Sequence, residues 1–267
     1  MNGGSSDARP PTSAGPGAGV LEVEGVTVRF GGVTALDDVS FTAPARQVTG
    51  IIGPNGAGKT TLLNVLCGFV RPDAGRLRFD GAEVKGLRPH RLASLGIART
   101  LQGVGLFRHL SVLENVMVGA EHVARAGFWS ALAGLPAADR RERMLRARAL
   151  EALDRVGAPD LADRMPDQLA FGLRKRVALA RAVVGGPRLL LLDEPASGLS
   201  ETELGGLGEL ITSLAADASV VVVEHDMAFV RSIAKRVTVL HEGSVIAEGD
   251  MDKVQNNPRV REVYLGE

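Results

Sequence analysis

The chain has 267 residues, of which 45% are apolar and 23% charged, as in a globular protein with one large domain or two small ones. Its 31 basic residues equal its 31 acidic residues, so the overall charge gives no indication of binding to nucleic acid or to an anionic membrane. The single cysteine, Cys67, excludes an intrachain disulfide and a cysteine-based zinc site, which fits a reducing compartment. Its apolar surroundings, LLNVLCGF, favour a buried structural thiol.

The first 19 residues, MNGGSSDARPPTSAGPGAG, are rich in Gly, Pro, Ser and Ala and contain no apolar stretch. We expect residues 1–19 to form a disordered tail that cannot act as the hydrophobic region of a signal peptide. The rest of the sequence contains no apolar run of about 18 residues that could cross a bilayer. We therefore expect a cytosolic chain that reaches a membrane only through a partner.

The first predicted element is a strand over residues 20–30, where apolar and polar side chains roughly alternate. This alternation is typical of a half-exposed antiparallel strand. Gly31 and Gly32 predict a turn, after which Val39 and Phe41 continue the strand pattern.

Three later runs have a different character. Residues 48–52, 189–192 and 220–223 are short and apolar throughout, or nearly so. Runs of this kind predict strands that are buried on both faces of a parallel sheet and separated by helices.

Two helix starts are marked by capping boxes, in which Ser111 precedes Glu114 and Ser200 precedes Glu203. The stretch from about residue 99 to residue 181 has a mainly helical pattern. The fold class that follows is α/β, with a mixed core and a helical insertion.

The strongest chemical signal is GPNGAGKTT, which lies between the apolar run ending at Ile52 and a helical run. It is a complete G-x-x-x-x-G-K-[ST] phosphate loop in a strand-loop-helix context. Its glycines let backbone N–H groups converge on phosphate oxygens, and the helix N-terminus adds partial positive charge. Lys59 can bind the β and γ phosphates, and the Thr60 hydroxyl can ligate magnesium. The predicted nucleotide-binding residues are therefore Gly53, Pro54, Asn55, Gly56, Ala57, Gly58, Lys59, Thr60 and Thr61.

The next signal is LLLLDEP, residues 189–195, in which a buried strand ends in two adjacent carboxylates. In phosphate-loop enzymes an aspartate at this place holds the magnesium ion. We assign Asp193 to magnesium and Glu194 to the general base that orients water. The alternative is a pair of exposed carboxylates with no catalytic role, which the phosphate loop upstream makes the weaker interpretation.

With these motifs in order, the chain resembles the nucleotide-binding subunit of ATP-binding cassette (ABC) transporters from about residue 20 to residue 267. The resemblance implies a P-loop NTPase fold with a RecA-like mixed sheet core, an N-terminal antiparallel β subdomain and a helical subdomain at about 99–181. It also implies ATP and Mg²⁺ as ligands.

Further residues match the family at single positions. Gln102, at the end of RTLQ, resembles the glutamine that senses the γ phosphate, contributes to the metal site and faces the membrane partner. His225, in VVVVEHD, resembles the switch histidine of catalysis, and Phe30 resembles the aromatic residue that stacks on adenine. SGLS, residues 197–200, occupies the loop that meets the opposite subunit of a dimer. Each of these residues, taken singly, could also have a packing role.

The segment LAFGL, residues 169–173, stands where the family carries LSGGQ, whose serine and glycine contact the γ phosphate of ATP held by the facing subunit. Ala170 removes the hydroxyl and Leu173 removes a polar amide, while Gly172 is retained. We expect Ala170, Phe171 and Gly172 still to face a phosphate, because a glycine at a helix N-terminus keeps its N–H groups and dipole. The alternative is a surface helix without this contact. With a different ATPase as partner, the site that borrows LAFGL should be the weaker one.

Several stretches, including VTVRFGGVTALDDVSF, LSVLENVMVG, VVVVEHDMAFV and REVYLGE, resemble the branch that powers branched-chain amino acid uptake. The resemblance implies a second ABC ATPase, integral-membrane permeases and an extracytoplasmic substrate-binding protein, with this chain at the cytoplasmic face of the cell membrane. The substrate stays open, because members of this group also serve urea, short amides and other hydrophobic amino acids.

Two other functions remain open at this point. A lipid-export ATPase would be a homodimer with an intact signature, which LAFGL argues against. A soluble cassette protein acting on ribosomes or DNA usually has two cassettes or a long coiled coil. This chain has one phosphate loop, no sustained heptad pattern and no net charge to indicate nucleic acid.

Overall fold

The computed structural model describes residues 19–100, 103–121 and 136–265. The expected tail therefore lies outside the described residues except for Gly19, which begins the first strand. In the described part of the chain, no helix is long and apolar enough to cross a membrane.

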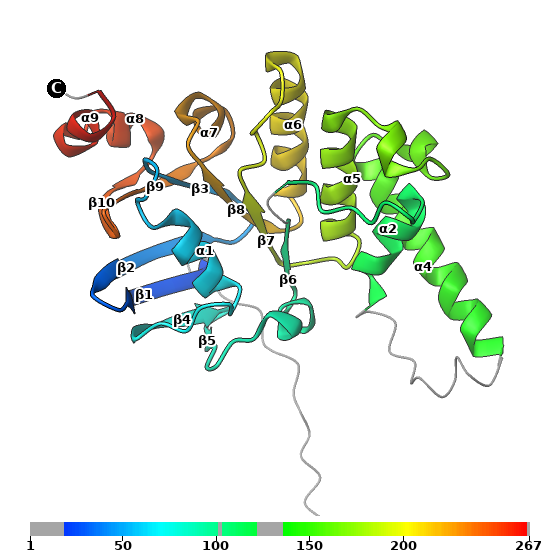
Figure 1. Ribbon diagram of the computed structural model, residues 1–267, viewed down its shortest axis with the longest axis horizontal. Helices are drawn as coiled ribbons and strands as arrows, with labels where there is room; N and C mark the ends of the chain where they lie inside the picture. The colour runs from blue at the N-terminus through cyan, green and yellow to red at the C-terminus, as the bar shows by residue number, and fades with distance from the viewer. Residues whose placement is uncertain (1–18, 101–102, 122–135, 266–267) are drawn as a thin grey trace, which may run out of the picture.

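The N-terminal part forms an antiparallel sheet with the strand order β2-β1-β4-β5 (Figure 1). Its strands are β1 (Gly19–Phe30), β2 (Val33–Pro44), β4 (Ala74–Phe79) and β5 (Ala82–Glu83). The predicted strand and turn are confirmed, since β1 pairs with β2 across the glycine turn.

The second sheet has the order β10-β9-β3-β8-β7-β6. All neighbours from β9 to β6 are parallel, and β10 is antiparallel to β9. The three predicted buried runs are adjacent strands, and every residue in them is buried. The strands are β3 (Val48–Ile52), β6 (Ile97–Arg99), β7 (Leu189–Asp193), β8 (Ser219–Glu224), β9 (Arg236–His241) and β10 (Ser244–Gly249).

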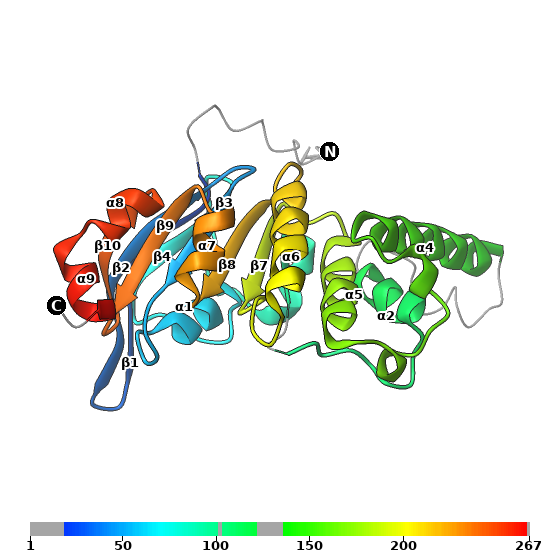
Figure 2. The ribbon, with the colours of Figure 1, turned by 90° about the horizontal axis from the view of Figure 1, so that it is seen from above.

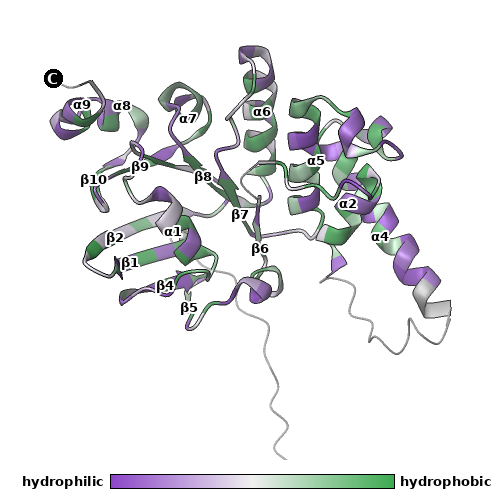
Figure 3. Ribbon diagram, in the orientation of Figure 1, coloured by the Kyte–Doolittle hydropathy of each residue, from purple (hydrophilic) through white to green (hydrophobic). Residues whose placement is uncertain are grey.

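The two faces of this sheet pack against different layers. Leu189 and Leu191 of β7 belong to a core shared with the antiparallel sheet and α1 (Lys59–Leu66). Leu190 and Leu192 belong to a second core shared with α6 (Glu201–Leu214) and α7 (Met227–Ile233). Because both faces are covered, β7 and β8 are hydrophobic along nearly their whole length (Figure 3).

The helical insertion forms a block beside β6 and β7, at the opposite end of the molecule from β10 (Figures 1 and 2). It consists of α2 (Val112–Gly119), α4 (Pro136–Arg155) and α5 (Phe171–Val183), which pack on one another. At the start of α2, the Ser111 N–H donates to the Glu114 carboxylate (2.7 Å) and the Glu114 N–H to the Ser111 hydroxyl (3.2 Å). This capping box is therefore confirmed.

The start predicted for α6 is also confirmed, since the Ser200 N–H donates to the Glu203 carboxylate at 2.9 Å. The chain ends in α8 (Met251–Gln255) and α9 (Pro258–Leu265), and α8 packs on β9 and β10. Single 3-10 turns occur at Pro89–Arg91, Ala93–Leu95, Pro159–Leu161 and Pro166–Gln168.

Candidate functional site

The predicted phosphate loop connects β3 to α1, and the helix begins at Lys59. Gly58 has φ 100°, and a Cβ placed on it would lie 2.8 Å from the carbonyl oxygen of Ala35. Only glycine tolerates both the positive φ and this close approach. The loop residues from Asn55 to Thr61 line one pocket, so the expected loop geometry is present.

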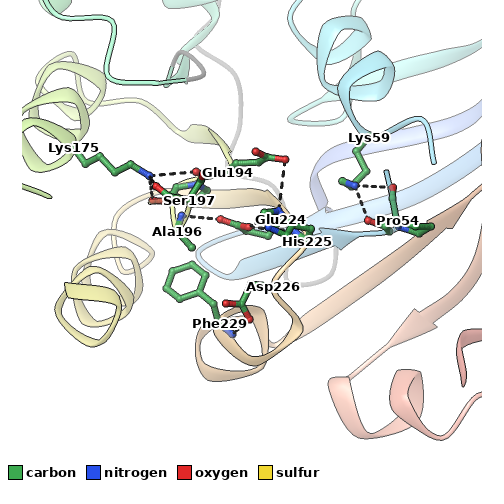
Figure 4. A network of polar contacts seen from close by, with 12 residues as sticks. Pro54, Lys59, Lys175, Glu194, Ala196, Ser197, Glu224, His225, Asp226 and Phe229 are labelled. Carbon is green, nitrogen blue, oxygen red and sulfur yellow. Dashed lines mark hydrogen bonds and ion pairs between the residues drawn. The ribbon is translucent and has the colours of Figure 1, made fainter. Parts of the chain in front are cut away.

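Lys59 is buried, and its ammonium group is bonded to the loop itself. Its Nζ donates to the carbonyl oxygens of Gly53 (2.6 Å) and Pro54 (2.9 Å), as Figure 4 shows. Burial lowers the pKa of Lys59 below its ordinary value. The nearby carboxylates of Glu194 and Glu224 act in the opposite direction and offset only part of this effect. The two carbonyl bonds hold a positive charge against the backbone of the loop.

Glu194 is the first residue after β7 and lies at the edge of the same pocket. The sheet order explains this position, because β7 neighbours β8 and β8 neighbours β3, so their carboxyl ends share one edge. The φ of Glu194 is 45°, a left-handed conformation that is uncommon for a residue with a side chain. Its backbone N–H donates to the Val223 carbonyl oxygen at 2.9 Å.

His225 directly follows β8 and lies beside Glu194. Its Nδ1 is 3.7 Å from Glu194 Oε1 and 3.6 Å from Glu224 Oε2 (Figure 4). The structure thus brings the expected base and the expected switch histidine together, from segments about 30 residues apart, and Glu194 also lines the phosphate-loop pocket.

The Asp193 carboxylate is paired with an arginine. Its Oδ2 accepts a hydrogen bond from Arg99 Nη2 at 3.1 Å, and both side chains are largely buried. Its backbone N–H donates to the Thr100 hydroxyl at 3.4 Å. Thr60 lines the phosphate-loop pocket, whereas Asp193 lines a second pocket on the side of the helical block.

The donor set fits a magnesium ion that arrives with a nucleotide. Thr60 and Asp193 supply oxygen atoms, and magnesium in phosphate-loop sites takes its other ligands from phosphates and water. Within the described ranges, no group of three or more His, Cys, Asp or Glu side chains could hold a metal by itself. Gln102, the third expected ligand, lies outside the described residues.

Glu224 is a residue of this site that sequence reasoning missed. Its side chain is fully buried and accepts hydrogen bonds from the backbone N–H groups of Ala196 (2.7 Å) and His225 (3.1 Å). Burial raises the pKa of Glu224, and these hydrogen bonds and His225 act in the opposite direction. A charged residue directly after four consecutive valines was the signal that could have revealed it.

Phe30, the expected adenine contact, is not among the residues that line the phosphate-loop pocket. Phe30 ends β1 with about half of its surface exposed (53%), and the phosphate-loop pocket is lined by the following strand instead. Val33, Thr34 and Ala35 from β2, together with Glu242 and Gly243 from the β9–β10 turn, complete that pocket. Nothing in the local sequence pattern marks these residues.

The segment corresponding to the signature lies at the start of α5, with Ala170 as the residue before the helix. Phe171 packs on Gly198, where a Cβ would lie 3.0 Å from the ring. A Cβ on Gly172 would collide with the Glu203 carboxylate. Phe171 and Gly172 therefore pack on Gly198 and Glu203. Ala170, Phe171 and Gly172 do not line the phosphate-loop pocket of their own chain.

Comparisons with known proteins agree with this site. Residues 36–197 match the family model described as ABC transporter, and residues 244–267 match a model described as branched-chain amino acid ATP-binding cassette transporter. The chain is 40% identical to the high-affinity branched-chain amino acid transport ATP-binding protein BraF of Pseudomonas aeruginosa, over 93% of this chain and 98% of that one. It is 37% identical to LivG of Escherichia coli, which has the same description, with the same coverage of both chains.

Solved structures give the same result. The ADP conformation of an ATP-binding cassette of an ABC transporter has a TM-score of 0.80 and 31% identity, covering 93% of this chain and 99% of that one. A dimeric ATP-binding cassette with ADP and phosphate has a TM-score of 0.71 and 27% identity, over 86% of this chain and 98% of that one. The phosphate loop, the paired carboxylates and the family match lead to one conclusion: the chain belongs to the ABC transporter family, as one of its ATP-binding, ATP-hydrolysing cassettes.

Proposed function

We propose that this chain is the ATP-hydrolysing subunit of an importer for branched-chain or other hydrophobic amino acids. Its relatives BraF and LivG carry that description over nearly their whole length, and the C-terminal residues 244–267 match the corresponding model. The observation that carries the hydrolytic part is the position of Glu194, between the phosphate loop and His225.

ATP binds with its phosphates in the loop of residues 53–61. Lys59 then exchanges its bonds to Gly53 and Pro54 for the β and γ phosphates, which gives its buried charge a stronger partner. Phe30, exposed at the end of β1, provides an aromatic face for the adenine.

Glu194 acts as the general base for hydrolysis. One of its carboxylate oxygens accepts a proton from the attacking water, and His225 Nδ1, 3.7 Å away, stabilises the charge that develops. Magnesium held by Thr60, Asp193 and Gln102 would neutralise charge on the β and γ phosphates. The Glu194 side chain is at hand for this role, because the residue lines the phosphate-loop pocket.

The membrane partner is a permease that docks where the helical block meets the core. A groove in this region is lined by apolar side chains, among them the exposed Phe69 and Phe107 and the partly exposed Val118. The family resemblance assigns Gln102, which lies outside the described residues, to this contact. The chain would thus lie at the cytoplasmic face of the membrane, with a second ABC ATPase as partner and an extracytoplasmic substrate-binding protein delivering the amino acid.

The nucleotide part is tested by ATP binding and hydrolysis of the full-length chain. Lys59→Met should abolish binding of a fluorescent ATP analogue, whereas Lys85→Met, at an exposed surface pair, should leave it unchanged. Equal binding by both variants would overturn the phosphate-loop assignment.

The transport part is tested by a pull-down of the tagged chain from detergent-solubilised native membranes. Permeases and a second ATPase in the eluate support the importer. Ribosomal or DNA-associated proteins would refute it, and a homodimer with a lipid-export permease would refute amino acid import.

A further inference from the structure

Lys175, a half-buried residue of α5, reaches from the helical block to the segment that carries Glu194. Its Nζ lies 2.5 Å from the carbonyl oxygens of Pro195 and Ser197, and 3.5 Å from that of Glu194 (Figure 4). These three acceptors are close to the full donor capacity of an ammonium group. A single side chain of the helical block therefore binds three of the four backbone carbonyl groups of residues 194–197.

The same segment is held from the other side by the core sheet. The Ala196 N–H donates to the buried carboxylate of Glu224 (2.7 Å), and the Glu194 N–H donates to the Val223 carbonyl oxygen (2.9 Å). Three carbonyl groups of the segment thus accept from Lys175, and the N–H groups of Glu194 and Ala196 donate to β8. The segment is fixed between a cation on the helical block and a carboxylate on the core.

This arrangement bears directly on Glu194 because its backbone is in the left-handed region, with φ 45°. Such a conformation is unfavourable for a residue with a side chain, and it persists only where surrounding contacts enforce it. The bonds from Lys175 to the carbonyls at 194, 195 and 197 are contacts of this kind. Without them, the segment could relax and carry the Glu194 carboxylate away from the phosphate loop.

Lys175 is itself fixed in place. Its Nζ lies 5.2 Å from the centre of the Phe171 ring, the aromatic residue of the segment corresponding to the signature. Burial lowers the pKa of Lys175 below its ordinary value, and the carboxylates of Glu224 and Glu194 offset only part of this effect. Phe171 also packs on Gly198, so the signature segment, Lys175 and residues 194–198 form one contact unit.

We propose that Lys175 is a positioning residue that couples the α5 N-terminus to Glu194 by fixing the backbone of residues 194–197. The inference rests on the proposed role of Glu194 as base, and Lys175 acts through Glu194 without touching the nucleotide. A displacement of α5 on contact with a facing subunit would thereby be passed to the catalytic carboxylate.

The test compares Lys175→Met, Lys175→Arg and Arg174→Met in the full-length chain, assembled with its membrane partners for the ATPase assay. Arg174 is the matched control, because its guanidinium lies over the same Phe171 ring (5.6 Å) but makes no side-chain hydrogen bond with the described residues. Lys175→Met keeps the apolar stem and removes only the ammonium donors. Lys175→Arg keeps the charge and several donors.

Lys175→Met should lower kcat about 10- to 100-fold, because small displacements of catalytic groups have effects of this size. The same variant should leave the KM for ATP within about twofold of that of the unchanged chain. Lys175→Arg should restore part of kcat, and Arg174→Met should match the unchanged chain. Hydrogen–deuterium exchange of the peptide spanning residues 193–200 should increase in Lys175→Met alone.

Unchanged kcat and unchanged exchange in Lys175→Met would overturn the proposal. Equal losses in Lys175→Met and Arg174→Met, with KM and thermal stability shifted together, would also overturn it, because they would indicate a general packing role. If the unchanged chain neither binds nor hydrolyses ATP, the proposed function fails, and the exchange experiment still decides whether Lys175 holds residues 194–197.

Discussion

Arg99 Nη2 donates a hydrogen bond to Asp193 Oδ2 at 3.1 Å, although the two residues are 94 positions apart in the sequence. Their side chains are 14% and 6% exposed, so the pair is almost entirely removed from water. It forms because β6 and β7 are parallel neighbours that end together at the functional edge of the sheet. The carboxylate expected to bind magnesium is therefore neutralised by an arginine.

Arg99→Met should lower the free energy of unfolding by about 3 to 5 kcal/mol, because it leaves a buried carboxylate without its partner. Magnesium with ATP should recover part of this loss, so its stabilising effect should be larger in the variant. Urea unfolding with and without the nucleotide measures both effects. Arg76→Met, which breaks an exposed pair with Glu24, should cost at most about 1 kcal/mol. A loss no larger than in that control would contradict the expectation.

Glu194→Gln should preserve ATP binding and reduce turnover by about 10²- to 10⁴-fold, because the amide cannot accept the proton of the attacking water. Glu209→Gln, an exposed position on α6, is the control and should leave kcat unchanged. Steady-state ATPase assays combined with a binding titration separate the two effects. Turnover that survives in Glu194→Gln would show that another group is the base.

Ala170→Ser combined with Leu173→Gln should raise hydrolysis at the site that pairs this α5 with the partner's phosphate loop. The change is best made in a chain that already carries Glu194→Gln, because its own site is then silent. One added hydrogen bond to a charged phosphate is worth about 1.5 kcal/mol, which corresponds to a gain of about tenfold. No change in single-site turnover or in nucleotide occlusion would argue against a phosphate-facing signature.

Cys67 gives a prediction about pH. Its side chain is fully buried, and burial raises the pKa of the thiol from 9.0 to about 11. Between these two values the folded state keeps a proton that the unfolded state loses, so the free energy of unfolding should decrease as pH rises. Between the two pKa values, the slope of the unfolding free energy against pH should differ by about 1 kcal/mol per pH unit between the unchanged chain and Cys67→Ala. Parallel curves from pH 9 to 10.5 would contradict the raised pKa.

Much of the fold could be predicted from local patterns. Continuous apolar runs identified β3, β7 and β8, and a serine three residues before a glutamate marked the starts of α2 and α6. These predictions succeed because each depends on residues within a few positions of one another. The glycines and Lys59 of the phosphate loop were recognisable for the same reason.

The pairing of distant groups could not be predicted in this way. Residue types suggested roles for Asp193 and His225, but not that Asp193 pairs with Arg99 or that Glu224 shares the site. The sequence did not indicate that β2 and the β9–β10 turn line the phosphate-loop pocket. These relationships depend on strand order, which the sequence pattern leaves open.

By itself, then, the sequence determined the elements that carry the chemistry: a phosphate loop, two buried strands followed by carboxylates and a histidine, and a helix with a glycine in its first turn. The tertiary structure alone decided how they meet. It places β7 between β6 and β8, so Asp193 turns to Arg99 while Glu194 turns to His225. It also brings Lys175 of α5 onto the backbone of residues 194–197. The physical reason is that side-chain patterns report local burial, whereas these contacts follow from how whole strands and helices pack.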